Sequence, residues 1–412
     1  MRTEQHRALP SWLVGSGVIA VAMGVMNLGT YGFTIIAARL LGPSEYGALA
    51  ALMGVLLVVN VASLGLQATG ARRVSAAPEE LAQIEADVLV ATYRSAIVVG
   101  VVCLAAAPLV ANLLRLDEWL SAAMLAATAV PLTVMGGQAG ILQGERRWLP
   151  LAGVYLAVGL GRVACGTAMM VLHRSTLSAM IGVAAGAVLP VVVGTLALRE
   201  PARRSGLTGR SRRVIREQFH HTHALLAFFA LSNVDVVMAR VLLDEHQAGL
   251  YAGGLILAKA VLFLPQFVVV IAFPSMSEVG AKVSMLLEAL ASVLLIGLLA
   301  TAAAWLLPRI AVEFIGGSAY GDLSDRLWAF AALGTIWAMT QLLVYNVVAR
   351  QNKRAVALVW LALVVLVSLS GTVSSIQTLL TLVLTVESTL LVVLLVLGLR
   401  RTARVEVLAD RD

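Results

Sequence analysis

Long apolar stretches separated by short polar segments dominate the chain. Each stretch holds about 20 residues, enough for a helix rising 1.5 Å per residue to cross roughly 30 Å of hydrocarbon. Because backbone groups in lipid must be hydrogen-bonded internally, these stretches are expected to be helices. The pattern predicts an all-α polytopic membrane protein with about 12 transmembrane helices, near 12–38, 46–70, 88–111, 119–141, 150–172, 177–198, 221–243, 248–274, 284–307, 326–347, 355–372 and 377–398.

Basic residues divide the connecting segments into two alternating sets. Of the 30 Lys and Arg residues, 21 fall in one set, six in the other and three within spans. The positive-inside rule assigns the basic set to the cytoplasm, and an even number of spans then places both termini there. The net charge of +7 in a chain that is 60% hydrophobic is thus explained by membrane topology, and no nucleic-acid partner is expected.

A basic segment separates two similar halves of six spans. We expect an N-terminal six-helix lobe over 1–198, a cytoplasmic linker over 199–219 and a C-terminal six-helix lobe over 220–412. Two similar runs follow the first span of each half, AARLLGPSEYGALAAL and MARVLLDEHQAGLYAGGL. Each has an Ala-Arg pair, aliphatic residues, an acidic turn and a small-residue stretch, and the second run aligns with the first when one inserted residue is allowed. Since six is even, the halves enter the membrane in the same orientation as parallel repeats.

Glycines four residues apart mark places where helices are expected to pack closely, since small residues let backbones approach. Three such pairs stand in the spans: Gly136/Gly140, Gly182/Gly186 and Gly249/Gly253.

The run ARLLGPSEYGALA resembles the polysaccharide-unit flippases of the MATE-like MOP superfamily. Gly65-Leu66 with Arg72-Arg73, Asp235, and the runs LYAGGLILAKAVLFLP and AFPSMSE are also similar to that family. The resemblance implies a MATE-like fold that works by alternating access in a bacterial cytoplasmic (inner) membrane. The implied cargo is an anionic polyprenyl-pyrophosphate-linked oligosaccharide, moved from the cytoplasmic to the outer leaflet. Membrane lipids are expected partners, and a polysaccharide polymerase or glycosyltransferases are candidate protein partners.

Three cations stand within predicted spans, where a charge costs about 2.5–3.5 kcal/mol or more. We predict that Arg162, Lys259 and Arg94 bind the substrate's pyrophosphate or an acidic sugar, because guanidinium and ammonium groups suit such anions. Two alternatives are open. Lys259 could instead form a buried ion pair with Asp235, and Arg94 could extend to the cytoplasmic interface.

Two acids within spans are candidates for ion coupling. Asp235 and Glu387 could bind H⁺ or Na⁺, and no other cofactor is expected. Asn27 and Asn233 occupy the first span of each half and could hydrogen-bond sugar hydroxyls. As an alternative, such residues bond neighbouring helices.

Catalytic signatures are missing from the sequence, which lacks a P-loop and a His-Glu-x-x-His motif, so we expect a transporter and not an enzyme. The histidines of FHHTH are expected to lie at the membrane interface, with no metal bound. A MATE-type cation or drug antiporter is the first alternative. A membrane-embedded polyprenyl-glycan glycosyltransferase or ligase using Glu313, Asp322 and Asp325 is the second.

Overall fold

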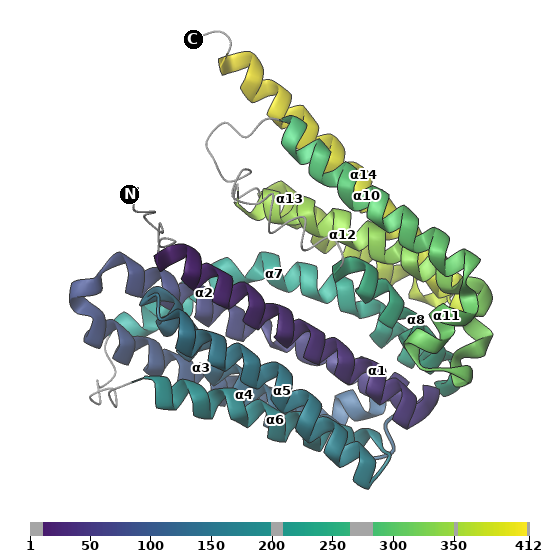
Figure 1. The fold of residues 1–412 in the computed structure, drawn as a ribbon, viewed down its shortest axis with the longest axis horizontal. Helices are drawn as coiled ribbons and strands as arrows, with labels where there is room; N and C mark the ends of the chain where they lie inside the picture. The colour runs from purple at the N-terminus through teal and green to yellow at the C-terminus, as the bar shows by residue number, and fades with distance from the viewer. Residues whose placement is uncertain (1–10, 199–208, 264–282, 350–352, 410–412) are drawn as a thin grey trace, which may run out of the picture. The chain divides into compact units, whose positions relative to one another are not determined.

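Helices make up almost the whole of the described chain (Figure 1). The computed structural model describes residues 11–198, 209–263, 283–349 and 353–409, and these residues contain no β-strand. The α-helices are α1 (Ser11–Val59), α2 (Val61–Ala76), α3 (Leu81–Leu113), α4 (Trp119–Gly144), α5 (Trp148–Leu172), α6 (Thr176–Ala197), α7 (Gly209–Leu242), α8 (Glu245–Phe263), α10 (Val283–Leu306), α11 (Pro308–Ile315), α12 (Leu327–Ala349), α13 (Lys353–Ser368) and α14 (Ile376–Ala409).

The predicted membrane spans agree with these helices. Ten helical stretches of the described residues are long and apolar enough to cross a membrane, and one of them, Gly17–Ala76, covers most of the first predicted span and all of the second. The predicted span 248–274 begins in α8 and runs beyond Phe263, outside the described residues. The prediction of an all-α polytopic membrane protein is therefore confirmed.

A glycine interrupts α1 at the turn expected between the first two spans. Gly42 has φ 72° and ψ 175°, a left-handed conformation that residues with a Cβ rarely adopt. Pro43 follows and lacks the N–H that a continuous helix would use. The chain is helical on both sides of this point, so the Gly-Pro pair produces a kink with no extended loop.

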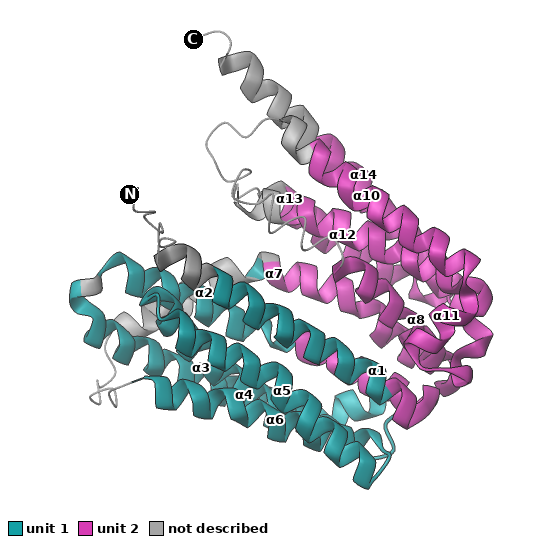
Figure 2. Cartoon of the chain, viewed as in Figure 1, with its two compact units in different colours: residues 1–37, 59–223 teal, residues 38–58, 224–412 magenta. Residues whose placement is uncertain are grey.

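The helices form two compact units (Figure 2). Unit 1 comprises Met1–Ala37 and Val59–His223, and unit 2 comprises Ala38–Val58 and Ala224–Asp412. These units differ from the predicted lobes mainly in the segment 38–58, which belongs to unit 2. Glycine contacts explain this, since a Cβ built on Gly47 would lie 2.9 Å from Gly249 Cα. Allowing for the one inserted residue, these two glycines are equivalent positions of the repeated runs.

In unit 1, α4 is the central helix and packs against α2, α3 and α6, while α5 packs along α6. Two of the predicted glycine pairs form these contacts. Gly136 and Gly140 of α4 meet the backbone of α2, and Gly182 and Gly186 of α6 meet the backbone of α5. In each case a Cβ would overlap the facing helix, so the prediction of close packing is confirmed for both pairs.

In unit 2, α12 holds the corresponding central position and packs against α8, α10 and α14. The third glycine pair lies in α8. A Cβ on Gly249 would overlap the carbonyl of Pro43, and one on Gly253 would overlap the ring of Tyr320. Tyr320 is fully buried and its hydroxyl donates to the carbonyl of Ala38 at 3.3 Å. This contact anchors the segment 38–58 within unit 2.

Replacing Gly249 with Leu is expected to destabilise the protein by about 1–3 kcal/mol, because an added side chain forces packed backbones apart. The measurement is the apparent Tm of detergent-purified protein by fluorescence-detected size exclusion. Gly32→Leu is the matched control, since a Cβ on Gly32 has nothing within 4 Å. Equal Tm values for the two variants would contradict the close contact at Gly249.

Candidate functional site

Asp235 lies in α7 and is buried in unit 2, with 1% of its surface exposed. Its Oδ2 accepts a hydrogen bond from the Tyr251 hydroxyl at 3.0 Å, and its Oδ1 accepts one from the Val236 N–H at 2.8 Å. Tyr251 is a fully buried residue of α8, and its ring packs edge-on against Phe330 at 5.3 Å between centroids. The apolar setting holds the Tyr251 hydroxyl toward the carboxylate.

Glu387 lies in α14 and is 2% exposed. Its Oε2 has no hydrogen-bond partner among the residues that the structure describes. The indole N–H of Trp337 in α12 lies close enough to interact with the Glu387 carboxyl but forms no well-aligned hydrogen bond within the described residues. The charges of Glu387 and Asp235 both act on Tyr251. We refer to Asp235, Tyr251, Trp337 and Glu387 as the acidic cluster.

Lys259 of α8 lies beside this cluster without a direct ion pair to it. Its ammonium interacts with Asp235 only through space, and its Nζ donates to Asn233 Oδ1 at 3.4 Å. The Asn233 side chain in turn donates to the Phe229 carbonyl at 2.9 Å. Four predicted site residues, Asn233, Asp235, Lys259 and Glu387, are thus brought together by α7, α8 and α14. The alternative of a buried ion pair between Lys259 and Asp235 stays a prediction, since the two charges interact without a direct contact.

The acidic cluster has the groups that a proton or a small cation requires. An unpaired polar atom costs about 1–3 kcal/mol when buried, so the free oxygen of Glu387 favours a bound proton or cation. Carboxylate and hydroxyl oxygens are suitable ligands for hard cations such as Na⁺. Groups of three or more His, Cys, Asp and Glu side chains that could hold a transition metal are not found in the described parts of the chain.

The other predicted site residues belong to unit 1 and lie on three different helices. Asn27 is in α1, Arg94 in α3 and Arg162 in α5, and all three side chains are partly exposed. Across the ranges that the structure describes, none of them has a hydrogen-bond or ion-pair partner. Arg162 therefore keeps an uncompensated charge far from either end of its helix, which suits an anionic ligand.

Sequence reasoning missed Tyr251 and Trp337 as members of the acidic cluster. Tyr251 stands 16 residues after Asp235, within the LYAGGL run, and its hydroxyl in an apolar span indicated a need for a hydrogen-bond acceptor. A polar network in unit 1 was also missed. There the Gln67 amide donates to Gln143 Oε1 at 3.0 Å and to the Tyr155 hydroxyl at 2.7 Å.

The three acids considered for catalysis lie on exposed surface of unit 2. Glu313 pairs with Arg39 at 3.2 Å, and Asp322 lies 3.8 Å from the His246 imidazole. Asp325 Oδ1 accepts from its neighbour Ser324 at 3.4 Å. These contacts tie short helices and turns together and form no shared catalytic constellation.

Comparison with known families adds to this geometry. The sequence pattern of the family described as "Polysaccharide biosynthesis protein" matches residues 13–280, which is more than half of the chain. The chain belongs to this polysaccharide biosynthesis family. No curated protein sequence matches it significantly.

Solved structures agree in fold at low sequence identity. A multidrug resistance MATE family transporter of the MOP superfamily, inward-facing, matches with a TM-score of 0.72 and 14% identity, over 93% of this chain and 95% of that one. The lipid II flippase MurJ, inward closed, matches with a TM-score of 0.74 and 12% identity, over 93% and 87%. A MOP superfamily transporter from Pyrococcus furiosus gives 0.61 and 13%, over 95% and 96%. The chain is a multi-pass membrane protein with the MOP transporter fold, and the resemblance drawn from its sequence is confirmed.

Proposed function

We propose that this protein flips a polyprenyl-pyrophosphate-linked oligosaccharide from the cytoplasmic to the outer leaflet of a bacterial cytoplasmic membrane. The observation that carries the proposal is membership of the polysaccharide biosynthesis family combined with a fold that serves both drug transporters and a lipid flippase. Alternating access moves the cargo, and both termini lie in the cytoplasm because the basic connecting segments do.

An unpaired cation of unit 1, Arg162, supports an anionic cargo. Arg162 offers a planar guanidinium with five donors, which matches a phosphate in two-point geometry. Lys259 in unit 2 adds a compact positive charge whose one hydrogen bond, to Asn233, is long. Arg94 adds a further cation in α3, while Asn27 and Asn233 supply amides for sugar hydroxyls.

The acidic cluster supports ion coupling by H⁺ or Na⁺. It holds two carboxyls in a space where both are almost fully enclosed by unit 2. The MATE-type antiporter is the alternative, and it would need an open acidic and aromatic cavity for its drug.

Deleting the gene in its own organism tests the proposal. Polyprenyl-linked glycans are extracted and quantified by mass spectrometry, and surface polysaccharide is measured in parallel. The expected result is accumulation of lipid-linked repeat units with loss of the surface polymer, both restored by the wild-type gene. Unchanged glycans with greater sensitivity to cationic drugs would overturn the flippase and favour the antiporter. Replacing Glu313, Asp322 and Asp325 by amides provides a further test. If lipid-linked glycans accumulate in that variant, and do not accumulate when residues within the spans are replaced, a glycosyltransferase or ligase would be favoured.

A further inference from the structure

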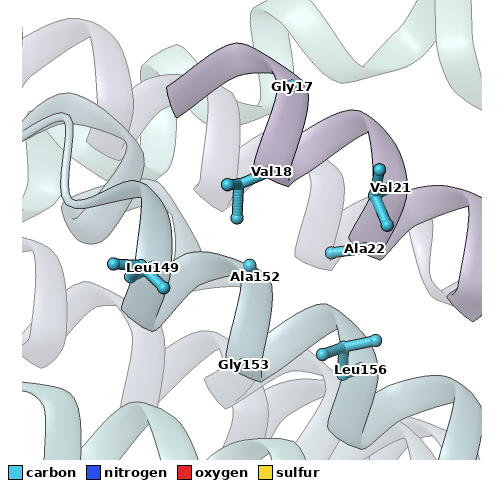
Figure 3. A pocket seen from close by; sticks show the side chains of 8 residues that line it. All are labelled: Gly17, Val18, Val21, Ala22, Leu149, Ala152, Gly153 and Leu156. Atoms are coloured by element: carbon cyan, nitrogen blue, oxygen red, sulfur yellow. The ribbon is translucent and has the colours of Figure 1, made fainter. Parts of the chain in front are cut away.

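An apolar groove runs between α1 and α5 in unit 1 (Figure 3). The groove has a volume of about 650 Å³ and is lined by Gly17, Val18, Val21, Ala22, Leu149, Ala152, Gly153 and Leu156. The side chains from α1 and α5 lie on opposite sides of the gap. Val21 is 68% exposed and Leu149 is 76% exposed, whereas Ala22 and Ala152 are buried, so the groove has an enclosed floor and opens to the surface at Val21 and Leu149.

The groove arises because two parallel helices touch at one end and diverge at the other. A Cβ built on Gly159 would lie 2.7 Å from Met26 Cα, and one on Gly29 would lie 3.2 Å from the Gly159 carbonyl oxygen. Further along, Gly166 contacts the Phe33 ring. Toward the N-terminal ends of both helices these contacts stop, and the groove opens there. The glycine contacts between α1 and α5 therefore close the groove at one end.

A free cation stands at the open end of the groove. Arg146 precedes Leu149 by three residues, so their Cα atoms are within about 11 Å. Its side chain is exposed and has no hydrogen-bond or ion-pair partner within the described ranges. The adjacent Arg147 is by contrast held in place, since it pairs with Glu145 at 3.2 Å and donates to the Ala197 carbonyl at 2.6 Å.

We propose that this groove holds the polyprenyl chain of the phosphate-bearing carrier lipid, with Arg146 contacting the phosphate. This inference rests on the proposed function, including its assignment of these helix ends to the cytoplasmic side where cargo is loaded. The lining is wholly aliphatic or glycine, which excludes a sugar as occupant. Gly and Ala stand among Val and Leu in this lining, so the wall is uneven in depth, which suits the branched chain of an isoprenoid. An exposed cation beside an apolar slot complements a lipid with a charged head and a long tail.

Photo-crosslinking tests the inference on the full-length protein in lipid nanodiscs. The probe is a polyprenyl phosphate with a diazirine in its isoprenoid chain, and cross-linked peptides are mapped by mass spectrometry. We expect labelling of residues 17–22 and 149–156, competed by unlabelled polyprenyl phosphate and not by excess phosphatidylglycerol. Gly17→Phe should reduce this labelling at least about tenfold, because excluding two methylene groups from an apolar site already changes an equilibrium by that factor.

Gly24→Phe is the matched control, since Gly24 is on the same helix, outside the groove, and both glycines have nothing within 4 Å of a built Cβ. It should label like the wild type, whereas Arg146→Gln should weaken labelling without moving it. Equal competition by phosphatidylglycerol would show a general phospholipid site and overturn the inference. Labelling that maps elsewhere, or that Gly17→Phe leaves unchanged, would do the same.

The deletion experiment keeps this result separate from the proposed function. If lipid-linked glycans accumulate on deletion but labelling maps outside the groove, the proposed flippase function is supported and only the lipid site in the groove is rejected. If lipid-linked glycans do not accumulate, the proposed flippase function is rejected, whatever the labelling pattern.

Discussion

Replacing Asp235 with Asn is expected to reduce glycan export at least about tenfold and to abolish its dependence on the coupling ion. The variant keeps the size of the side chain and its contact with the Tyr251 hydroxyl but removes the charge. Hydrogen bonds to a charged group are worth roughly 1.5–3 kcal/mol, so losing the charged ligand in a desolvated site changes ion affinity by a factor of ten or more. Export is measured in the deletion strain complemented with each variant, over a series of Na⁺ concentrations and pH values.

Asp87→Asn is the matched control, because Asp87 is also a buried aspartate in a helix but lies in unit 1. It should keep the wild-type ion dependence even if its expression falls. Glu387→Gln should resemble Asp235→Asn, and Tyr251→Phe should show a smaller loss, since it removes one donor and no charge. Full export by Asp235→Asn with unchanged ion dependence would exclude the acidic cluster as the coupling site.

The span pattern of this chain was predictable from sequence because hydrocarbon imposes it. Each apolar stretch has to be long and helical, and the glycine pairs that permit close packing are visible as letters four positions apart. Gly136/Gly140, Gly182/Gly186 and Gly249/Gly253 all face a neighbouring helix or ring as expected. The Ala-Arg-Leu-Leu-Gly-Pro turn also led to the correct superfamily. Its Gly-Pro pair forms the kink at Gly42, so a backbone feature of the fold is written in the local sequence.

Helix rotation and long-range pairing were not predictable. The segment 38–58 joins unit 2 because Gly47 meets Gly249, a contact between residues about 200 positions apart. Arg39 likewise pairs with Glu313, although nearer acids such as Glu45 stand in the same turn. Tyr251 is an aromatic residue in an apolar span, and the sequence pattern is the same whether its side chain faces lipid or a carboxylate. Only the packing of α7, α8 and α14 decides which face each helix presents.

Replacing Arg162 or Lys259 with Ala is expected to reduce export roughly tenfold each, with membrane insertion unchanged. Each substitution removes one cation that a phosphate could contact, an interaction of about 1.5–3 kcal/mol for a charged hydrogen bond. The measurement is the ratio of accumulated lipid-linked glycan to surface polymer, normalised to protein level by immunoblot. Arg174→Ala is the control, since Arg174 is exposed between α5 and α6 and should leave export unchanged. Normal export in both single variants and in the double variant would exclude the substrate-binding role.

Conservative variants and ion dependence separate substrate binding from a structural role. Arg162→Lys should recover part of the export, because the charge remains while the two-point fork is lost. Lys259 needs a second readout, since its charge also acts on Asp235 through space. If Lys259 binds cargo, Lys259→Ala weakens export and leaves the ion concentration for half-maximal export in place. If it serves to balance Asp235, the same variant shifts that ion concentration severalfold, because the site then has one positive charge fewer.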